Sequence, residues 1–286
     1  MTPTPYASAF TAAVVIAILH CSGPALAGGA PRQAVDERPS LDEGLRLFYN
    51  GRYEAAAAFA LPMCAEAPVD LNACELTTSA LHFQIRRALG IPNKPKEWKA
   101  CAECAPLLAS FLAVTARGQG AARAILKLDP SDDRTLFLLG KLDLNFVWLQ
   151  LATLGKKTGW KEYWEARRLL DDLVKRKPDM IRARVARAWI DYIVDTRMPR
   201  GTRWLLGGGD KKKGLRVVRE AANTPADFFV ATEAVFALWD MQVRERQLPD
   251  AITTARRLAR DFPENEDLAK FLATHDTAAR GVVPKR

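Results

Sequence analysis

The sequence predicts an all-α fold built from about five antiparallel helix pairs. Three observations support this prediction. Apolar residues recur at helical spacing through most of the 286 residues. A small residue stands twelve positions before a proline at three places along the chain. No sustained alternation of apolar and polar residues indicates a strand. Because 49% of the residues are hydrophobic, a chain of this length can bury a sizeable core.

The first 27 residues resemble an export signal. Residues 12–19 form an apolar run that is short for a membrane span, and the small-x-small pattern Ala25-Leu26-Ala27 follows it. We therefore expect cleavage after Ala27 and a periplasmic or secreted protein. The alternative is a chain anchored to the membrane through this N-terminal segment. Residues 28–39 are predicted to form a flexible lead-in, since they contain glycine, proline and mixed charge without periodicity.

Four cysteines follow the expected cleavage site, and an oxidising compartment would favour disulfide bonds between them. Four cysteines allow three pairings. We favour Cys64 with Cys74 and Cys101 with Cys104, because this pairing closes only short loops. Free buried thiols, a metal site or a redox motif at Cys101-x-x-Cys104 are the alternatives.

Small residues and prolines mark the predicted helix pairs. A small side chain lets two helices approach closely, and a proline cannot continue a helix. Three spacings of twelve residues join Ala56 to Pro68, Ala166 to Pro178 and Ala251 to Pro263. The other expected packing residues are Gly44, Tyr53, Gly140 and Tyr163.

This pattern resembles the tetratricopeptide repeat (TPR), in which a small residue, a glycine turn, an aromatic, an alanine and a proline follow one another. The resemblance covers most of residues 41–270. It implies a curved stack of helix pairs whose concave surface binds peptides or other proteins. We accordingly place a repeat domain at residues 40–272 and a loose basic tail at residues 273–286.

The third repeat is predicted to have elongated helices, since Gly140 lies about fourteen residues farther from Ala166 than a simple repeat allows. The apolar stretch 136–154 belongs to this repeat. Four polar residues interrupt it, which favours a buried helix over a membrane span; they are Lys141, Asp143, Asn145 and Gln150. The long repeat and a later glycine-rich turn also resemble the TPR partners of periplasmic substrate-uptake transporters.

The sequence offers little support for catalysis. It contains neither a His-Glu-x-x-His zinc motif nor a Gly-x-Ser-x-Gly nucleophile motif. We predict no catalytic residue, no cofactor and no metal. The glycine- and lysine-rich run 207–213 could hold an anion on its backbone amides. We favour the alternative, an inter-helix turn with Asp210 as the N-cap of the next helix.

Six of the seven tryptophans fall in the later part of the chain and could line a groove. The helical spacing of Trp189 and Tyr192 favours packing instead. The candidate groove residues are Trp148, Trp160, Trp164, Arg187, Trp189, Tyr192, Arg203, Trp204 and Lys211. The net charge of +9 would suit an acidic partner, although interspersed charges also serve solubility, and the expected export argues against nucleic acid.

These features lead to three hypotheses for function. The first is a non-enzymatic interaction protein of the cell envelope, which binds a protein or peptide segment through a partly basic concave face. The second is a small-molecule carrier, or transporter-associated partner, with a ligand between the long helices of residues 134–196. The third is an enzyme that uses Cys101 and Cys104 in thiol exchange.

Overall fold

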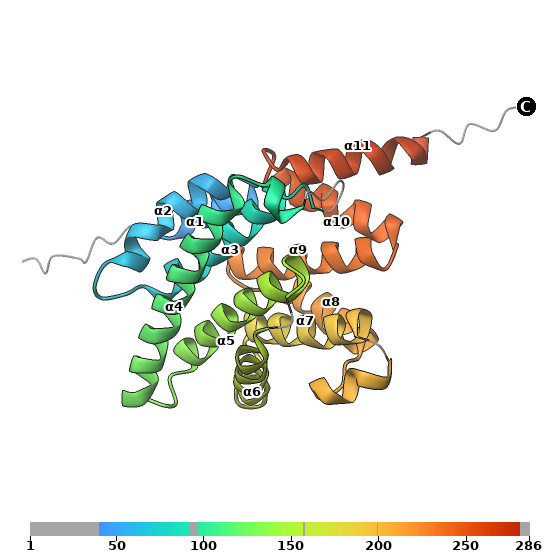
Figure 1. Cartoon of the computed structure of the whole chain (residues 1–286). Helices are drawn as coiled ribbons and strands as arrows, with labels where there is room; N and C mark the ends of the chain where they lie inside the picture. Colours follow the sequence, from blue (N-terminus) through green and yellow to red (C-terminus); the bar gives the residue numbers. More distant parts are fainter. Residues whose placement is uncertain (1–39, 92–96, 157, 199, 281–286) are drawn as a thin grey trace, which may run out of the picture. The chain divides into compact units, whose positions relative to one another are not determined.

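The computed structural model describes residues 40–91, 97–156, 158–198 and 200–280. The predicted export signal and lead-in lie outside these residues. Within the described ranges all regular secondary structure is helical, as the sequence predicts, and these ranges form one compact unit (Figure 1).

The described residues form five successive helix pairs followed by a further helix. Each helix packs against the next, and the first helices of neighbouring pairs also touch, as α3 does with α5 and α7 with α9. The pairs are α1 (Asp42–Tyr49) with α2 (Tyr53–Ala65), α3 (Leu71–Ala88) with α4 (Cys104–Leu128), α5 (Asp133–Val147) with α6 (Trp160–Arg176), α7 (Ile181–Arg197) with α8 (Lys211–Ala222), and α9 (Phe228–Arg244) with α10 (Leu248–Asp261). Helix α11 (Glu266–Arg280) follows, and three short turns are η1 (Trp98–Ala100), η2 (Trp148–Thr153) and η3 (Arg200–Leu206).

The residues expected to pack the helix pairs lie where the spacing places them. Ala56, Ala166 and Ala251 are all fully buried. Tyr53, Tyr163 and Gly44 are buried as well. The three prolines follow the second helices of their pairs, just beyond the C-caps Glu66, Lys177 and Phe262; they are Pro68, Pro178 and Pro263.

The additional residues of the third pair lie mainly between the end of α5 and the start of α6. Helix α6 has 17 residues, as α7 and α9 have. Helix α5 instead continues into the π-helical turn η2, and a loop then leads to Gly159. The longest described helix is α4, with 25 residues. Its Gly118 permits close packing, because a Cβ there would lie 2.8 Å from Leu142 and 3.0 Å from the Cβ of Cys74.

The segment expected to be a loose tail is helical in its first part, because α11 runs through residues 273–280. Local contacts explain this. The Thr274 hydroxyl donates to the Lys270 carbonyl at 2.8 Å, and Asp276 pairs with Arg256 of α10 at 2.6 Å. Residues 281–286 lie outside the described part. Among the described helices, none has the length and apolar character that crossing a membrane requires.

The first and last helix pairs meet, so the stack of pairs closes into a ring. Tyr49 at the end of α1 stacks on Phe236 of α9 with ring centroids 5.1 Å apart, and it also touches Phe262 after α10 at 5.4 Å. The side-chain amide of Asn265 donates to the Tyr49 carbonyl at 2.7 Å. We call this contact between the first and last pairs the closure; Figure 1 shows α1 and α11 on the same side of the unit.

The substitution Ala166→Trp tests the assigned register of the repeats. We expect it to lower the free energy of unfolding by about 1–3 kcal/mol, because an indole has no room between packed helices. Ala166 is fully buried, and its carbonyl would lie 3.8 Å from a Cβ at Gly140. Urea denaturation measures the effect. The matched control is Ala109→Trp on the exposed side of α4, which should change stability by about 0.5 kcal/mol or less; an unchanged midpoint for Ala166→Trp would contradict the register.

Candidate functional site

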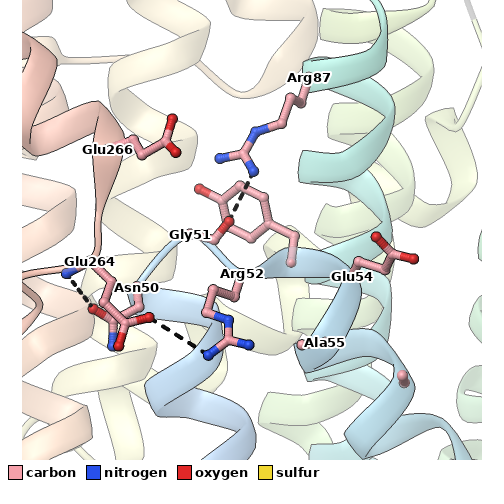
Figure 2. Close-up of a pocket in the computed structure, with 10 residues that line it drawn as sticks. Asn50, Gly51, Arg52, Glu54, Ala55, Arg87, Glu264 and Glu266 are labelled. Atoms are coloured by element: carbon pink, nitrogen blue, oxygen red, sulfur yellow. Dashed lines mark hydrogen bonds and ion pairs between the residues drawn. The ribbon is translucent and has the colours of Figure 1, made fainter.

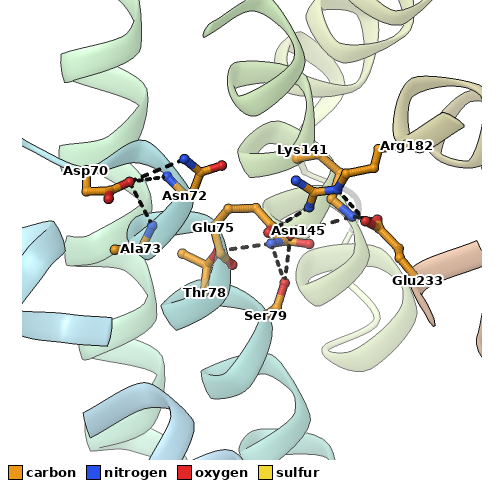
Figure 3. A network of polar contacts seen from close by, with 10 residues as sticks. All are labelled: Asp70, Asn72, Ala73, Glu75, Thr78, Ser79, Lys141, Asn145, Arg182 and Glu233. Carbon is orange, nitrogen blue, oxygen red and sulfur yellow. Dashed lines mark hydrogen bonds and ion pairs between the residues drawn. The ribbon is translucent and has the colours of Figure 1, made fainter. Parts of the chain in front are cut away.

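Four charged side chains meet where the inner helices α3, α5, α7 and α9 face one another (Figure 3). Glu233 accepts from Lys141 Nζ at 2.7 Å and from Arg182 Nε at 2.5 Å. Glu75 lies 3.5 Å from Lys141 Nζ and 3.3 Å from an Arg182 terminal nitrogen. We call these four residues the central charge cluster. Its two acidic and two basic groups balance in formal charge.

Opposite charges within the cluster overcome the cost of burying each group. Burial acts to raise the pKa of Glu233, but Arg182 and Lys141 outweigh it and hold that pKa well below its ordinary value. Burial acts to lower the pKa of Lys141, but Glu233 and Glu75 raise it further than burial lowers it. These groups therefore stay ionised inside the protein.

Neutral polar residues extend the cluster along α3 and α5. The Asn145 amide donates to Thr78 Oγ1 at 2.9 Å and to Ser79 Oγ at 3.0 Å, and Ser79 donates to Glu75 at 3.2 Å. Asn145 and Lys141 are two of the polar residues that interrupt the apolar stretch of the sequence. Both point inward, so the interruption marks the inner side of α5 (Figure 3).

The central charge cluster and the closure fill the inner side of the ring. Glu75 and Tyr49 are buried, and the side chains of Glu233, Lys141 and Arg182 are no more than a quarter exposed. We expected an open concave face that binds a peptide. In the described structure Glu75, Lys141, Arg182 and Glu233 pair with one another on the inner helices, so these four side chains are not free to bind a partner.

Asp143 is a second buried charged residue, held between α4, α5 and α6. Its Oδ1 accepts from the Gln119 amide at 2.7 Å and lies 3.8 Å from Arg123. Arg123 is bound more closely by Glu165, at 2.6 Å. Burial raises the pKa of Asp143 to about 8, and the nearby charge of Glu165 adds to the effect.

This raised pKa predicts a pH-dependent stability. Between about pH 5 and pH 7 the folded chain keeps a proton on Asp143 that the unfolded chain has released, so the free energy of unfolding should fall by about 1.4 kcal/mol per pH unit from this residue alone. The variant Asp143→Asn lacks this dependence. Its stability relative to the unchanged protein should therefore rise with pH, as urea denaturation at the two pH values would show. Parallel pH profiles would contradict the assignment.

The nine candidate groove residues do not line one groove. Trp148 and Trp189 are partly buried in the packing, and the buried Tyr192 donates its hydroxyl to Glu245 at 3.0 Å. Three basic residues are engaged in ion pairs: Arg187 with Asp171 and Asp191, Arg203 with Asp195, and Lys211 with Glu245. The remaining residues, Trp160, Trp164 and Trp204, are exposed.

The glycine-rich run forms the inter-helix turn that we favoured. Asp210 is the N-cap of α8 and accepts from the Lys213 amide at 2.9 Å. Asp195 accepts from the Lys211 amide at 2.9 Å. The carboxylates of Asp195 and Asp210 thus occupy the Lys211 and Lys213 backbone amides, which a bound anion would need as donors. Gly207 and Gly208 have φ angles of +73° and +76°, which glycine adopts without strain.

The cysteines form the two local disulfide bonds that we favoured, Cys64–Cys74 between α2 and α3 and Cys101–Cys104 at the start of α4. His82 is buried, and its Nε2 lies 2.9 Å from the Thr153 hydroxyl. Burial lowers the pKa of His82 to about 3. In the described ranges no three or more His, Cys, Asp or Glu residues are grouped so as to hold a metal ion.

Two neighbouring surface hollows lie near the α1–α2 turn, and the first of them is at the closure. A hollow of about 570 Å³ is lined by the α1–α2 turn together with Arg87, Glu264 and Glu266 (Figure 2). A second, of about 550 Å³, shares Arg87 and extends to Cys101. Arg87 donates to the Gly51 carbonyl at 3.0 Å and lies 4.0 Å from Asp267. Opposite charges thus pair across the closure, and these hollows lie outside the region 134–196 considered for a carrier.

The paired helices, the fully buried alanines and the prolines after the second helices decide the fold. The described chain is a TPR-like α-solenoid. Among solved structures it is similar to a thermophilic TPR protein of Thermus thermophilus, with 16% identity and a TM-score of 0.44 over 82% of this chain and 96% of that chain. No protein-family model matches the sequence, and no curated protein does.

Sequence reasoning missed an apolar outer surface on α2 and α4. Ala58, Leu61 and Pro62 of α2 are exposed, and so are four residues of α4: Ala109, Leu112, Ala113 and Ala116. We call these seven residues the α2–α4 face. Its signal was present in the sequence as two runs without any charged residue, 55–65 and 104–116.

Proposed function

We propose that the chain is a non-enzymatic interaction scaffold of the cell envelope that binds a protein partner on the α2–α4 face. The observation that carries this proposal is that both helices expose apolar residues where an outer helix normally exposes charged ones. Leu61 is 43% exposed and Leu112 is 38% exposed. Exposed apolar residues gathered on a protein surface are typical of interaction sites.

The outer helices of later pairs show the usual pattern. Helix α8 exposes Lys212, Lys213 and Arg219, and α10 exposes Arg256 and Arg257. The same repeat architecture therefore leaves charged outer surfaces when nothing has to cover them. The uncharged stretches 55–65 of α2 and 104–116 of α4 are a local difference in composition, and a partner that buries their exposed residues would gain hydrophobic stabilisation.

The α2–α4 face suits a protein better than a small ligand. The centres of protein interfaces are apolar and depleted of charge. Helices α2 and α4 are also held together, because the Arg117 guanidinium of α4 donates to the Cys64 carbonyl at 2.8 Å and to that of Ala65. A surface carried by two helices that are held together in this way needs little ordering before it binds.

The proposed location in the cell envelope rests on two features. The N-terminal 27 residues resemble an export signal. The two disulfide bonds fit an oxidising compartment.

Native mass spectrometry of the protein isolated gently from its own cells tests this function. We expect a bound polypeptide with the unchanged protein and its loss from the double variant Leu61→Glu with Leu112→Glu. The matched control, Arg257→Glu, reverses one charge on the outer face of α10 and should keep the partner. A polypeptide retained by the double variant, or a bound small molecule in its place, would contradict the proposal.

A further inference from the structure

We infer that a second surface, formed by Trp160 and Trp164 of α6 with Trp204 and Leu205 of η3, binds an anionic lipid membrane. We call these four residues the tryptophan face. The inference goes beyond the proposed function, because it concerns other helices and another class of partner. A protein with both surfaces would hold its protein partner next to a membrane.

All four side chains are unusually exposed for their size. Trp204 is 72% exposed, Leu205 52%, Trp164 44% and Trp160 42%. Inserting these four side chains into the apolar part of a membrane would remove a large apolar area from water. Tryptophan favours the boundary between lipid and water, because its ring is apolar while its N–H can still form a hydrogen bond.

Tyr163 joins the two parts of the tryptophan face. Its hydroxyl donates to the Leu206 carbonyl at 2.8 Å, while its ring meets that of Trp164 edge to face at 5.3 Å. Tyr163 thus contacts both Trp164 and the segment that carries Trp204 and Leu205. Trp160 lies one helical turn before Trp164 on α6.

The turn that carries Trp204 is fixed at its base. Asp195 at the end of α7 binds the Arg203 guanidinium and accepts from the Lys211 amide, so both sides of the turn return to one carboxylate. Arg167 of α6 donates to the Gly207 carbonyl at 2.7 Å. The exposed Trp204 and Leu205 are thus held on an ordered turn, which lowers the entropic cost of inserting them into a lipid surface.

Basic residues are frequent in the two segments that carry the tryptophan face. Residues 197–216 contain seven basic residues and one acidic residue, a net charge of +6, and residues 155–168 contain five basic and two acidic residues, a net charge of +3. Some of these basic residues pair with acidic residues outside the two segments: Arg167 with Asp171, Arg203 with Asp195, and Lys211 with Glu245. Lys161, Arg168, Lys212 and Lys213 are exposed. Basic side chains beside exposed tryptophans are the combination that anionic headgroups attract.

These features favour a membrane over other partners. A second copy of the chain would bring two strongly basic segments together, and like charges repel. A protein partner would need pockets that fit the exposed rings of α6 and η3. A lipid surface has no fixed shape and needs no such pockets. Lys161 and Arg168 are exposed on the same helix as Trp160 and Trp164, so electrostatic attraction and apolar insertion would act together.

Vesicle binding by residues 40–286 tests the inference, since these residues form a compact unit and lack the apolar N-terminal run. We expect binding to vesicles of phosphatidylcholine mixed with phosphatidylglycerol, with a shift of tryptophan fluorescence to shorter wavelength. Binding to phosphatidylcholine alone should be about tenfold weaker or more, and high salt should weaken binding to the mixed vesicles.

Two variants and a control decide which residues act. Lys212→Glu with Lys213→Glu, and Trp204→Ala with Leu205→Ala, should each weaken binding to mixed vesicles about tenfold or more. Leu61→Glu with Leu112→Glu should bind vesicles normally while losing the protein partner, so each proposal can fail alone. Equal binding to both vesicle types, or binding unchanged in both tryptophan-face variants, would overturn the inference. So would a dimer that Trp204→Ala with Leu205→Ala dissociates, or binding to polyglutamate without binding to vesicles.

Discussion

Replacing Glu233 with glutamine is expected to lower the free energy of unfolding by about 3–5 kcal/mol, the cost of leaving buried charges without their partner. Glu233 contacts Lys141 at 2.7 Å and Arg182 at 2.5 Å, and all three are largely buried. Glutamine keeps the shape but removes the negative charge, so only Glu75 would remain to balance two cations. Urea denaturation of residues 40–286 measures the change.

The exposed ion pair of Arg52 and Glu264 provides the control. These side chains are 58% and 61% exposed and lie 3.6 Å apart across the closure. Glu264→Gln should therefore change stability by about 1 kcal/mol or less, because water and salt screen the pair. If Glu264→Gln and Glu233→Gln lower the free energy of unfolding by similar amounts, the central charge cluster is not buried away from water, and the expectation is wrong.

The helix pairs were predictable because their signals are local. A buried alanine and a proline twelve residues later, such as Ala56 and Pro68, lie within one supersecondary unit. The spacing therefore predicted where the second helices of the first, third and fifth pairs lie. The glycine- and lysine-rich run likewise predicted Asp210 as an N-cap, since an aspartate before a helix binds amides within the same turn.

The closure and the central charge cluster were not predictable from such signals. Glu75 and Glu233 stand more than 150 residues apart, and they meet through Lys141 and Arg182 only because small rotations between successive pairs add up around the ring. The polar interruptions of the stretch 136–154 indicated a buried helix correctly. They could not indicate the partners, which lie on other helices.

The exposure of individual tryptophans could not be predicted from the sequence either. Trp189 and Tyr192 stand at helical spacing, and their rings meet edge to face at 5.6 Å in the packed interior. Trp160 and Trp164 are also one turn apart on a helix, yet both are exposed. Spacing shows that two residues share a face of a helix, whereas the neighbouring helices determine whether that face is covered.

Phe262→Ala is expected to cost about 3–5 kcal/mol, as truncation of a fully buried aromatic side chain usually does. Phe262 is 0% exposed. Its ring lies 5.4 Å from that of Tyr49 and 5.8 Å from those of Phe228 and Phe236. The substitution would thus leave a cavity at the closure itself. Phe228→Ala is the matched control, and it should cost clearly less, because Phe228 is already 46% exposed.

Hydrogen exchange of the same variant shows whether the closure is a separate contact or part of one cooperative unit. In a repeat array each pair is stabilised mainly by its neighbours, so a cavity at the closure should speed exchange first in α1 and α11. The amide of Leu268 bonds to Asn265, whose side chain holds the Tyr49 carbonyl, and it should lose protection early. Helices α5 and α6 should keep theirs. Uniform loss of protection would contradict this expectation and show that ring closure and pair stacking break together.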